Sequence, residues 1–117
     1  MSLRFELPFP PSVNHYWRRV GARTLISRTG RAFRASVCSL LAARRVQPLD
    51  GPLIVQIDVY PPDRRRRDVD NLPKAILDAL QHGGAYHDDS QIVSLTITKR
   101  EVVPEGKTEV LIEKAEC

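Results

Sequence analysis

Acidic and basic residues that could act on a phosphate group are concentrated in one stretch of the chain. Four consecutive arginines, Arg64 to Arg67, run directly into Asp68 and Asp70, and a second acidic pair, Asp88–Asp89, follows. In an extended segment, residues two apart point to the same side, so the carboxylates of Asp68 and Asp70 can converge. Such carboxylates repel each other unless a cation lies between them, and Mg²⁺ binds one or two carboxylates together with waters and phosphate. The stretch therefore predicts a Mg²⁺ site, in which Mn²⁺ could substitute, beside a phosphate-binding loop.

The second acidic pair is the expected source of a third metal ligand, and Lys74 is a further catalytic candidate. Asp88 or Asp89 reaches the ion only if the Gly83–Gly84 turn returns the chain to the start of the preceding helix, since a helix of roughly 12 residues spans about 18 Å. Lys74 follows Asp70 by one helical turn on the same face. There it either pairs with that carboxylate structurally or stabilises charge on a phosphoryl oxygen.

Each of these features also has an explanation without catalysis. An Asp-x-Asp-Asn sequence before a helix is commonly a capping element. A run of arginines is commonly a solvated loop, and Asp88-Asp89-Ser90 has the composition of a turn. All three features fall within 27 residues, 63–89. Three unrelated structural features would have to fall in this short stretch by chance, so we favour one functional site.

The charges are distributed unevenly along the chain. The formal net charge is +4, but residues 1–67 hold 13 Lys/Arg against 4 Asp/Glu, whereas residues 68–117 hold 5 against 10. This asymmetry suggests a surface that draws a polyanion toward a separate acidic site, the alternative being charges scattered around an ordinary domain. Besides the run of four, the arginines expected to contact a phosphate backbone are Arg18, Arg19, Arg31 and Arg34.

The stretch 12–19 is expected to be a loop in which Tyr16 and Trp17 adjoin two arginines. Aromatic rings beside arginines suit stacking on bases combined with phosphate contact. The same rings would equally plug one edge of a hydrophobic core. The sequence leaves both interpretations open.

Hydrophobic periodicity predicts a single compact domain over residues 1–117, of α+β (α/β-like) class, with one mixed sheet and two helices. The expected order is ββαβαββ, with strands at 3–7, 23–27, 53–60, 91–100 and 108–113 and helices at 31–46 and 71–82. Asp70 is the expected N-cap of the second helix, and the last two strands are expected to form a hairpin.

Other classes of protein are not supported by the composition. Cys38 and Cys117 form no CxxC motif, and the three histidines lack zinc-ligand spacing. No apolar run approaches the roughly 18 residues of a membrane span. We therefore expect a protein of the reducing cytoplasm, with Cys117 free and no membrane partner.

The central motif strongly resembles the RusA family of Holliday junction resolvases. The resemblance rests on residues 62–74, PDRRRRDVDNLPK, on the continuation at 77–80, and on Asp88–Asp89 followed by a strand. The segment 10–14, PPSVN, followed by aromatics and Arg18, also looks like the opening of that family. The resemblance extends from about Leu7 to Arg100.

The resemblance implies a small homodimeric, Mg²⁺-dependent endonuclease from a bacterium, phage or prophage that cuts four-way DNA junctions by two symmetric nicks. Carried over by position, the metal-binding carboxylates would be Asp68, Asp70 and Asp89, and the catalytic lysine would be Lys74. Asp88 and Asn71 are further candidates whose roles stay open. A two-fold dimer would also present two identical sites to the two equivalent strands of a junction.

Two other functions are compatible with the same residues. A non-catalytic DNA-binding or packaging protein would keep the basic surface and bind junctions without cleaving them at any metal concentration. A metal-dependent ribonuclease would prefer RNA hairpins to DNA junctions.

Overall fold

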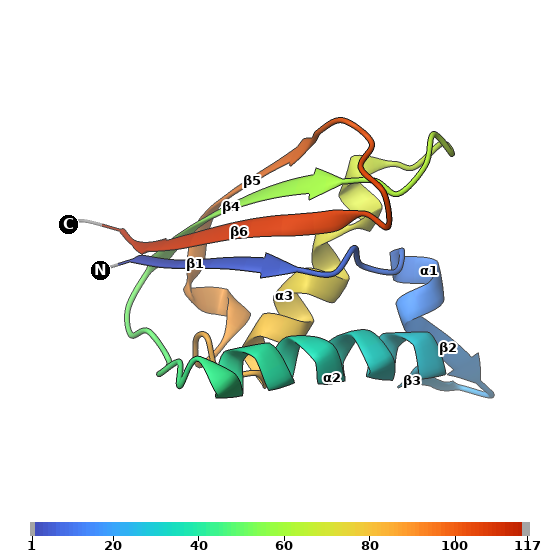
Figure 1. Ribbon diagram of the computed structural model, residues 1–117. Coiled ribbons are helices and arrows are strands. Elements are labelled where there is room, and N and C mark those ends of the chain that lie inside the picture. The colour runs from blue at the N-terminus through green and yellow to red at the C-terminus, as the bar shows by residue number, and fades with distance from the viewer. Residues whose placement is uncertain (1, 116–117) are drawn as a thin grey trace.

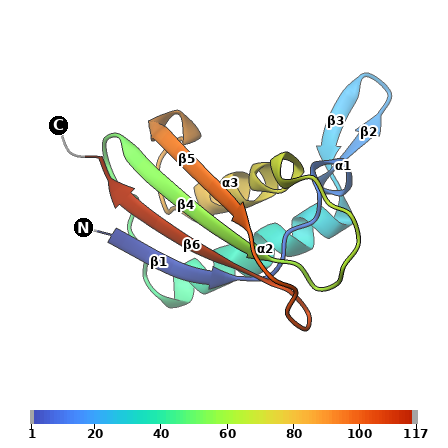
Figure 2. The same ribbon diagram turned by 90° about the horizontal axis from the view of Figure 1, so that it is seen from above.

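The computed structural model describes residues 2–115, apart from the side chains of residues 13 and 14, so Cys117 lies outside it. A four-stranded mixed sheet carries two helices on one face, and a small hairpin extends from one end (Figures 1 and 2). The strands are β1 (Ser2–Leu7), β2 (Trp17–Val20), β3 (Arg23–Ile26), β4 (Leu53–Tyr60), β5 (Ile92–Lys99) and β6 (Lys107–Lys114). The helices are α1 (Val13–Tyr16), α2 (Arg28–Ala43) and α3 (Pro73–His82), with single 3₁₀ turns η1 (Val69–Asn71) and η2 (Asp89–Gln91).

The strand order in the main sheet is β1-β6-β4-β5. Strand β6 is antiparallel to both β1 and β4, whereas β5 is parallel to β4. The predicted terminal hairpin is therefore wrong, because β5 and β6 lie on opposite sides of β4. The β4–α3–β5 segment is a βαβ unit, which requires a parallel pair joined by a helix. The connection 100–106 then returns the chain to the central position, where Val110 and Ile112 are fully covered.

The hydrophobic core lies between the sheet and the two long helices. Residues of β4 alternate, so Val55 and Ile57 face the helices while Gln56 and Asp58 face away. The buried stripe of α2 is Gly30, Phe33, Val37 and Leu41, and that of α3 is Ala75, Ile76, Ala79 and Leu80. The predicted α+β class, mixed sheet and pair of helices are confirmed.

The stretch 12–19 is not the loop that the sequence predicts. It forms one helical turn, α1, and then β2, which pairs with β3 in a separate two-stranded hairpin. Tyr16 is fully buried and contacts Trp17 edge to face, with ring centroids 4.9 Å apart. Of the two interpretations left open, stacking on bases or filling an edge of the core, Tyr16 fits the second. The buried ring anchors the start of the hairpin to the core.

Gly30 allows α2 to approach the backbone of Tyr16. A Cβ atom at this position would lie 2.3 Å from the Tyr16 carbonyl oxygen. We expect Gly30→Ala to lower the free energy of unfolding by roughly 1–3 kcal/mol, as overpacking does, although alanine is normally the better helix former. Urea denaturation measures the change, and Ser36→Ala on the exposed face of α2 is the matched control. A Gly30→Ala variant as stable as the control would contradict the close approach.

Candidate active site

The loop between β4 and α3 is organised by Asp63. Its carboxylate accepts hydrogen bonds from the Arg65 amide at 2.9 Å and from the Arg67 guanidinium at 2.8 Å. These bonds, that of Arg67 first, hold the pKa of Asp63 below its usual value. The Arg67 guanidinium also lies over the ring of Phe9, 5.1 Å from its centroid. The loop is thus anchored to the chain segment that follows β1.

The four arginines consequently have two different roles. Arg67 is used within the loop, and its side chain is only 19% exposed. Arg64, Arg65 and Arg66 are exposed to solvent. Exposed guanidinium groups remain available for phosphate, which they bind in a planar, forked geometry. The predicted phosphate contacts are therefore best supplied by the first three arginines, with Arg67 shaping the loop that presents them.

Asp68 and Asp70 are not used for capping. The residue that precedes α3 is Leu72, not the predicted Asp70, and neither Leu72 at α3 nor Asp68 at η1 makes a side-chain cap hydrogen bond. In the part of the chain described, neither carboxylate forms an ion pair or hydrogen bond, and both residues are exposed. The reason is that η1 intervenes and Pro73 begins α3 without needing an amide partner. The capping explanation of the Asp-x-Asp motif is thereby excluded.

Two adjoining hollows open beside this acidic pair. The deeper, of about 520 Å³, is lined by Phe9, Pro10, Pro11, Ser12, His15, Arg65, Arg66, Arg67, Asp68, Asn71 and Leu72. The shallower one is lined by Arg67, Asp68, Val69, Asp70, Ile97, Thr98 and Lys99. Arg67 and Asp68 belong to both. The proline-rich segment after β1 and the arginine-aspartate motif, far apart in sequence, thus form one surface.

Three polar residues beside the acidic pair differ in how well the sequence indicated them. Lys74 is exposed in the first turn of α3, and no ion pair joins it to Asp70 within residues 2–115, so the structural pairing is not observed. Asn71 lines the deeper hollow, as a candidate should. Lys99 was missed: its Nζ donates to the Arg67 carbonyl at 2.9 Å and it lines the shallower hollow. Its place at the carboxyl end of the predicted strand 91–100 was the available signal.

The second acidic pair lies elsewhere. Asp88 caps η2, its carboxylate accepting from the Ser90 amide at 3.0 Å, and hydrogen bonding by Ser90, from its side chain first and then from its amide, lowers the pKa of Asp88. The Asp89 amide donates to Gln81 Oε1 at 3.0 Å, near the carboxyl end of α3. Its carboxylate has no partner within the described chain. Asp88 therefore has the structural role in a turn that the sequence offered as an alternative, whereas Asp89 stays available as a ligand.

The two acidic pairs do not meet within one chain. Across residues 2–115, no three His, Cys, Asp or Glu side chains are close enough together to hold a metal ion. The Gly83–Gly84 turn is fastened at the far end of α3, where the Ala85 amide donates to the Leu80 carbonyl at 3.0 Å and the Leu49 amide to the Ala85 carbonyl at 3.0 Å. The expected return of this loop to the start of α3 does not occur. Asp68 and Asp70 alone still suit Mg²⁺, which requires only one or two carboxylates.

The other predicted DNA-contacting arginines lie on and beside the β2–β3 hairpin. Arg18 and Arg19 are exposed on β2. Arg31 is exposed at the start of α2, with its guanidinium bonded to the Ile26 carbonyl at 3.2 Å. Both views show the hairpin and the β4–α3 loop at the same end of the molecule (Figures 1 and 2). Their basic side chains can therefore follow one polyanion.

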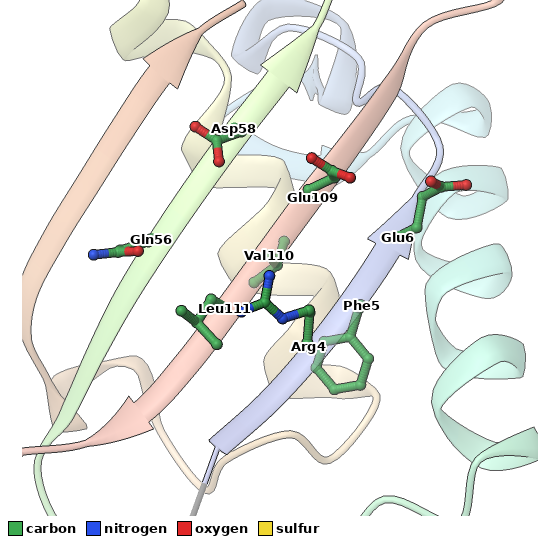
Figure 3. Close-up of a pocket in the computed structure, with 8 residues that line it drawn as sticks. All are labelled: Arg4, Phe5, Glu6, Gln56, Asp58, Glu109, Val110 and Leu111. Atoms are coloured by element: carbon green, nitrogen blue, oxygen red, sulfur yellow. The ribbon is translucent and has the colours of Figure 1, made fainter.

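The open face of the sheet carries charges of both signs. A hollow of about 250 Å³ lies over β1, β4 and β6, and the carboxylates of Glu6, Asp58 and Glu109 point into its surroundings together with Arg4 (Figure 3). Lys107 pairs with Glu6 at 3.6 Å and with Glu109 at 3.7 Å, and Arg100 pairs with Asp58 at 3.0 Å. Cations that are already paired with carboxylates attract phosphate less than the exposed arginines of the loop and hairpin end do, so DNA is expected at that end.

Comparison with known proteins agrees with the motif. The family model described as Endodeoxyribonuclease RusA matches residues 8–113. The chain belongs to the RusA family. It is 41% identical to the crossover junction endodeoxyribonuclease rusA of Enterobacteria phage 82, over 91% of this chain and 89% of that protein. It is 40% identical to the RusA protein of Escherichia coli K12 and 41% identical to that of Shigella sonnei, with the same coverage. The resemblance stated from the sequence is confirmed.

In this RusA family member, Arg34 is engaged inside the fold. Its guanidinium donates to Asp78 at 2.8 Å and to the Tyr16 hydroxyl at 3.3 Å, and that hydroxyl also donates to Asp78. The three side chains come from α1, α2 and α3. The sequence placed Arg34 toward solvent or phosphate, but its side chain is only 23% exposed. Its contact with DNA stays a prediction, and its observed role is to hold the base of the hairpin.

Tyr16, Arg34 and Asp78 together form a brace between the three helices. Because of this brace, we expect the free energy of unfolding to depend on pH in the alkaline range. Burial, followed by the hydrogen bond to Asp78, raises the pKa of Tyr16 to about 12. A tyrosine in the unfolded chain ionises near pH 10. The stabilising contribution of the Tyr16 hydroxyl is thus fully present below about pH 10 and is lost as the pH rises toward 12.

We expect the difference in free energy of unfolding between wild type and Tyr16→Phe to shrink as the pH rises above about 10. Urea denaturation of both proteins between pH 8 and 11 measures it. Tyr86, whose pKa burial also raises, is present in both proteins and cancels. A difference that stays constant with pH would contradict the brace.

Proposed function

We propose that this protein is a Mg²⁺-dependent, structure-selective endonuclease that resolves four-way DNA junctions by paired symmetric nicks in recombination and repair. One observation carries the proposal. Among the described residues, Asp68 and Asp70 have no cap bond and no ion pair, and they open onto a hollow that shares Arg67 with the arginine-lined surface. The relatives named as crossover junction endodeoxyribonucleases support this choice of substrate.

Asp68 and Asp70 would hold the metal beside the scissile phosphate. A divalent ion bound there would supply a water of lowered pKa and stabilise charge on the phosphoryl oxygens. The two carboxylates also exclude a third anion from the hollow unless a cation is present. This arrangement makes productive phosphate binding depend on the metal.

The cationic side chains of the chain would do the remaining work. The exposed arginines hold the DNA backbone on either side of the hollow, which positions one phosphate at the acidic pair. Lys74, in the first turn of α3, would stabilise the developing charge or the leaving oxygen. Lys99 places a further ammonium group at the rim of the same hollow.

The proposed assembly is a homodimer, since paired nicks require two sites related by symmetry. The proposed location is the cytoplasm of a bacterium, including one that carries a phage or prophage, where junction DNA is found. No helix among residues 2–115 is sufficiently long and apolar to cross a membrane.

A cleavage assay on a mobile four-way DNA junction tests the function. With Mg²⁺ or Mn²⁺ we expect symmetric nicks in two opposing strands, and without divalent metal we expect binding only. Linear duplex DNA and an RNA hairpin serve as competing substrates in the same reactions. Junction binding without cleavage at any metal concentration would support the DNA-binding alternative, and preferred cleavage of RNA would support the ribonuclease.

A further inference from the structure

The deeper hollow is lined by two kinds of side chain. Its apolar lining is Phe9, Pro10, Pro11 and Leu72, and its polar lining includes Ser12, His15 and Asn71. A phosphate group needs hydrogen-bond donors on every side, so the apolar part of this lining does not serve it. A nucleobase has apolar flat faces and an edge of donors and acceptors, which fit both kinds of lining. The volume of about 520 Å³ also lies within the roughly 300–1,000 Å³ of sites that hold small organic ligands.

The apolar wall is held in place by two separate contacts with Phe9. The Arg67 guanidinium lies over the Phe9 ring, 5.1 Å from its centroid, and is itself bonded to Asp63 at 2.8 Å. Gly106 packs so closely that a Cβ atom there would lie 2.9 Å from the Phe9 Cβ and 3.0 Å from the Pro62 Cδ. The hollow is therefore formed before a ligand enters, which lowers the ordering cost of binding.

Two side chains of the polar wall keep hydrogen-bonding groups available for a ligand. The buried ring of Tyr16 anchors α1 to the core, and α1 carries His15 at the hollow. The Nδ1 atom of His15 lies 3.0 Å from the Ser12 Oγ, so Nε2 is the ring nitrogen left for a ligand. The side-chain amide of Asn71 forms no hydrogen bond to another described residue. An imidazole and an amide together supply the donors and acceptors that match a base edge.

The position of this hollow connects it with cleavage. Arg67 and Asp68 line both the deeper hollow and the shallower one that contains Asp70. A nucleotide beside the phosphate at the acidic pair can therefore place its base in the deeper hollow. In an intact duplex the bases are stacked and paired, and extruding one costs roughly a few kcal/mol, whereas an unpaired base needs less. A branch point, where stacking is interrupted, thus supplies such a base more readily than a linear duplex does.

We propose that the deeper hollow binds one unstacked nucleobase of the junction, next to the phosphate at Asp68 and Asp70, and that His15 and Asn71 recognise its edge. The inference rests on the proposed nuclease function for the choice of a DNA junction as ligand. Linear duplex DNA would contact the arginines without supplying a base to the hollow. The hollow thereby restricts productive binding to branch points and makes it depend on which base is present there.

Fluorescence of 2-aminopurine tests whether a base leaves its stack on binding. The label is placed in turn at each nucleotide next to the branch point of an immobile four-way junction. Binding is measured in EDTA with the Asp70→Asn protein, so that no strand is cut and repulsion of the phosphate is reduced. We expect a several-fold change in fluorescence at one or more positions, and no change when the same label lies in a linear duplex. A junction that binds without a response at any position would overturn the proposal.

Filling the hollow shows whether the base enters it. Ser12→Trp, added to the Asp70→Asn protein, introduces a large ring into the lining, and we expect it to abolish the fluorescence response. Ser36→Trp adds the same ring on the exposed face of α2 and should leave the response unchanged. A response that persists in a folded Ser12→Trp protein would place the unstacked base elsewhere and overturn the proposal.

Recognition of the base edge is tested on four junctions that differ only at the responding position. We expect the affinity of the Asp70→Asn protein to vary roughly tenfold among the four bases, and the further changes His15→Ala and Asn71→Ala to remove most of this variation. Affinity for linear duplex DNA should stay the same. The matched control, Gln47→Ala with His87→Ala, removes an amide and an imidazole from exposed positions outside the hollow. Equal variation in the two double variants would contradict recognition by His15 and Asn71.

The outcomes separate this inference from the proposed function. If wild type never cleaves a junction, the nuclease proposal fails, and the fluorescence response, measured without metal, still decides the hollow. If wild type cleaves but no labelled base responds, the hollow does not bind a base and the nuclease proposal stands. Weaker binding of all four junctions by Ser12→Trp, with the response intact, would indicate a phosphate site instead. Circular dichroism checks each fold, and the His15→Ala/Asn71→Ala variant provides the test if Ser12→Trp does not fold.

Discussion

We expect Asp70→Asn to lower the rate of Mg²⁺-dependent junction nicking by about 10³-fold or more, because the loss of a charged ligand removes several kcal/mol of transition-state stabilisation. Junction binding should survive or tighten, since one negative charge beside the phosphate is removed. Single-turnover cleavage on a labelled four-way junction measures the rate, and gel retardation in EDTA measures binding.

Glu113→Gln is the matched control for this substitution. It makes the same change in charge on the exposed part of β6, where Glu113 forms no ion pair with a described residue. Its cleavage rate should equal that of wild type. An Asp70→Asn variant that cuts at the wild-type rate would remove the acidic pair from the proposed mechanism. Loss of binding together with cleavage would instead indicate that Asp70 supports the loop.

Replacing the three exposed arginines, Arg64, Arg65 and Arg66, by glutamine should weaken junction binding by roughly 10²-fold at 0.15 M salt. Each lost phosphate contact lowers the slope of log K against log salt by about 0.9, so the slope should fall by about 2.7. Fluorescence anisotropy at several salt concentrations gives both quantities. The arginines contribute in proportion to the phosphates they neutralise, so the two effects must change together.

The control removes the same charge from the other end of the sheet. Arg4, Arg45 and Lys114 are exposed there, away from the β4–α3 loop. Replacing these three by glutamine should change the slope by less than one unit. Equal effects of the two triple variants would mean that net charge alone drives binding. Arg67→Gln is expected to differ from both, because it also releases Asp63 and uncovers Phe9.

Local patterns in the sequence determined the types of element and the faces they bury. The alternation in 53–60 specified which side of β4 faces the core, and the helical spacing of Phe33, Val37 and Leu41 specified the buried stripe of α2. These periods depend only on backbone geometry, so they can be read without the fold. The candidate site could be recognised from the sequence as well, because its aspartates and arginines are neighbours along the chain.

The same patterns could not specify which strands are neighbours. The hairpin expected for the last two strands is absent because β6 enters the sheet between β1 and β4. Strand order depends on pairings across long stretches of chain, which alternation does not encode. The short elements α1 and β2 were missed similarly, since the ring of Tyr16 is buried in a core formed with distant parts of the chain, which local periodicity does not reveal.

The sequence by itself determined that this chain carries two acidic pairs, a lysine and an arginine-rich loop with the composition of a metal-dependent nuclease. Only the tertiary structure decided how they are used. It pairs Arg67 with Asp63 and Arg34 with Asp78, makes Asp88 a cap, and leaves Asp68 and Asp70 without a partner among residues 2–115. It also set the two acidic pairs apart, because helix α3 and strand β5 are rigid elements whose lengths fix the distance between their ends.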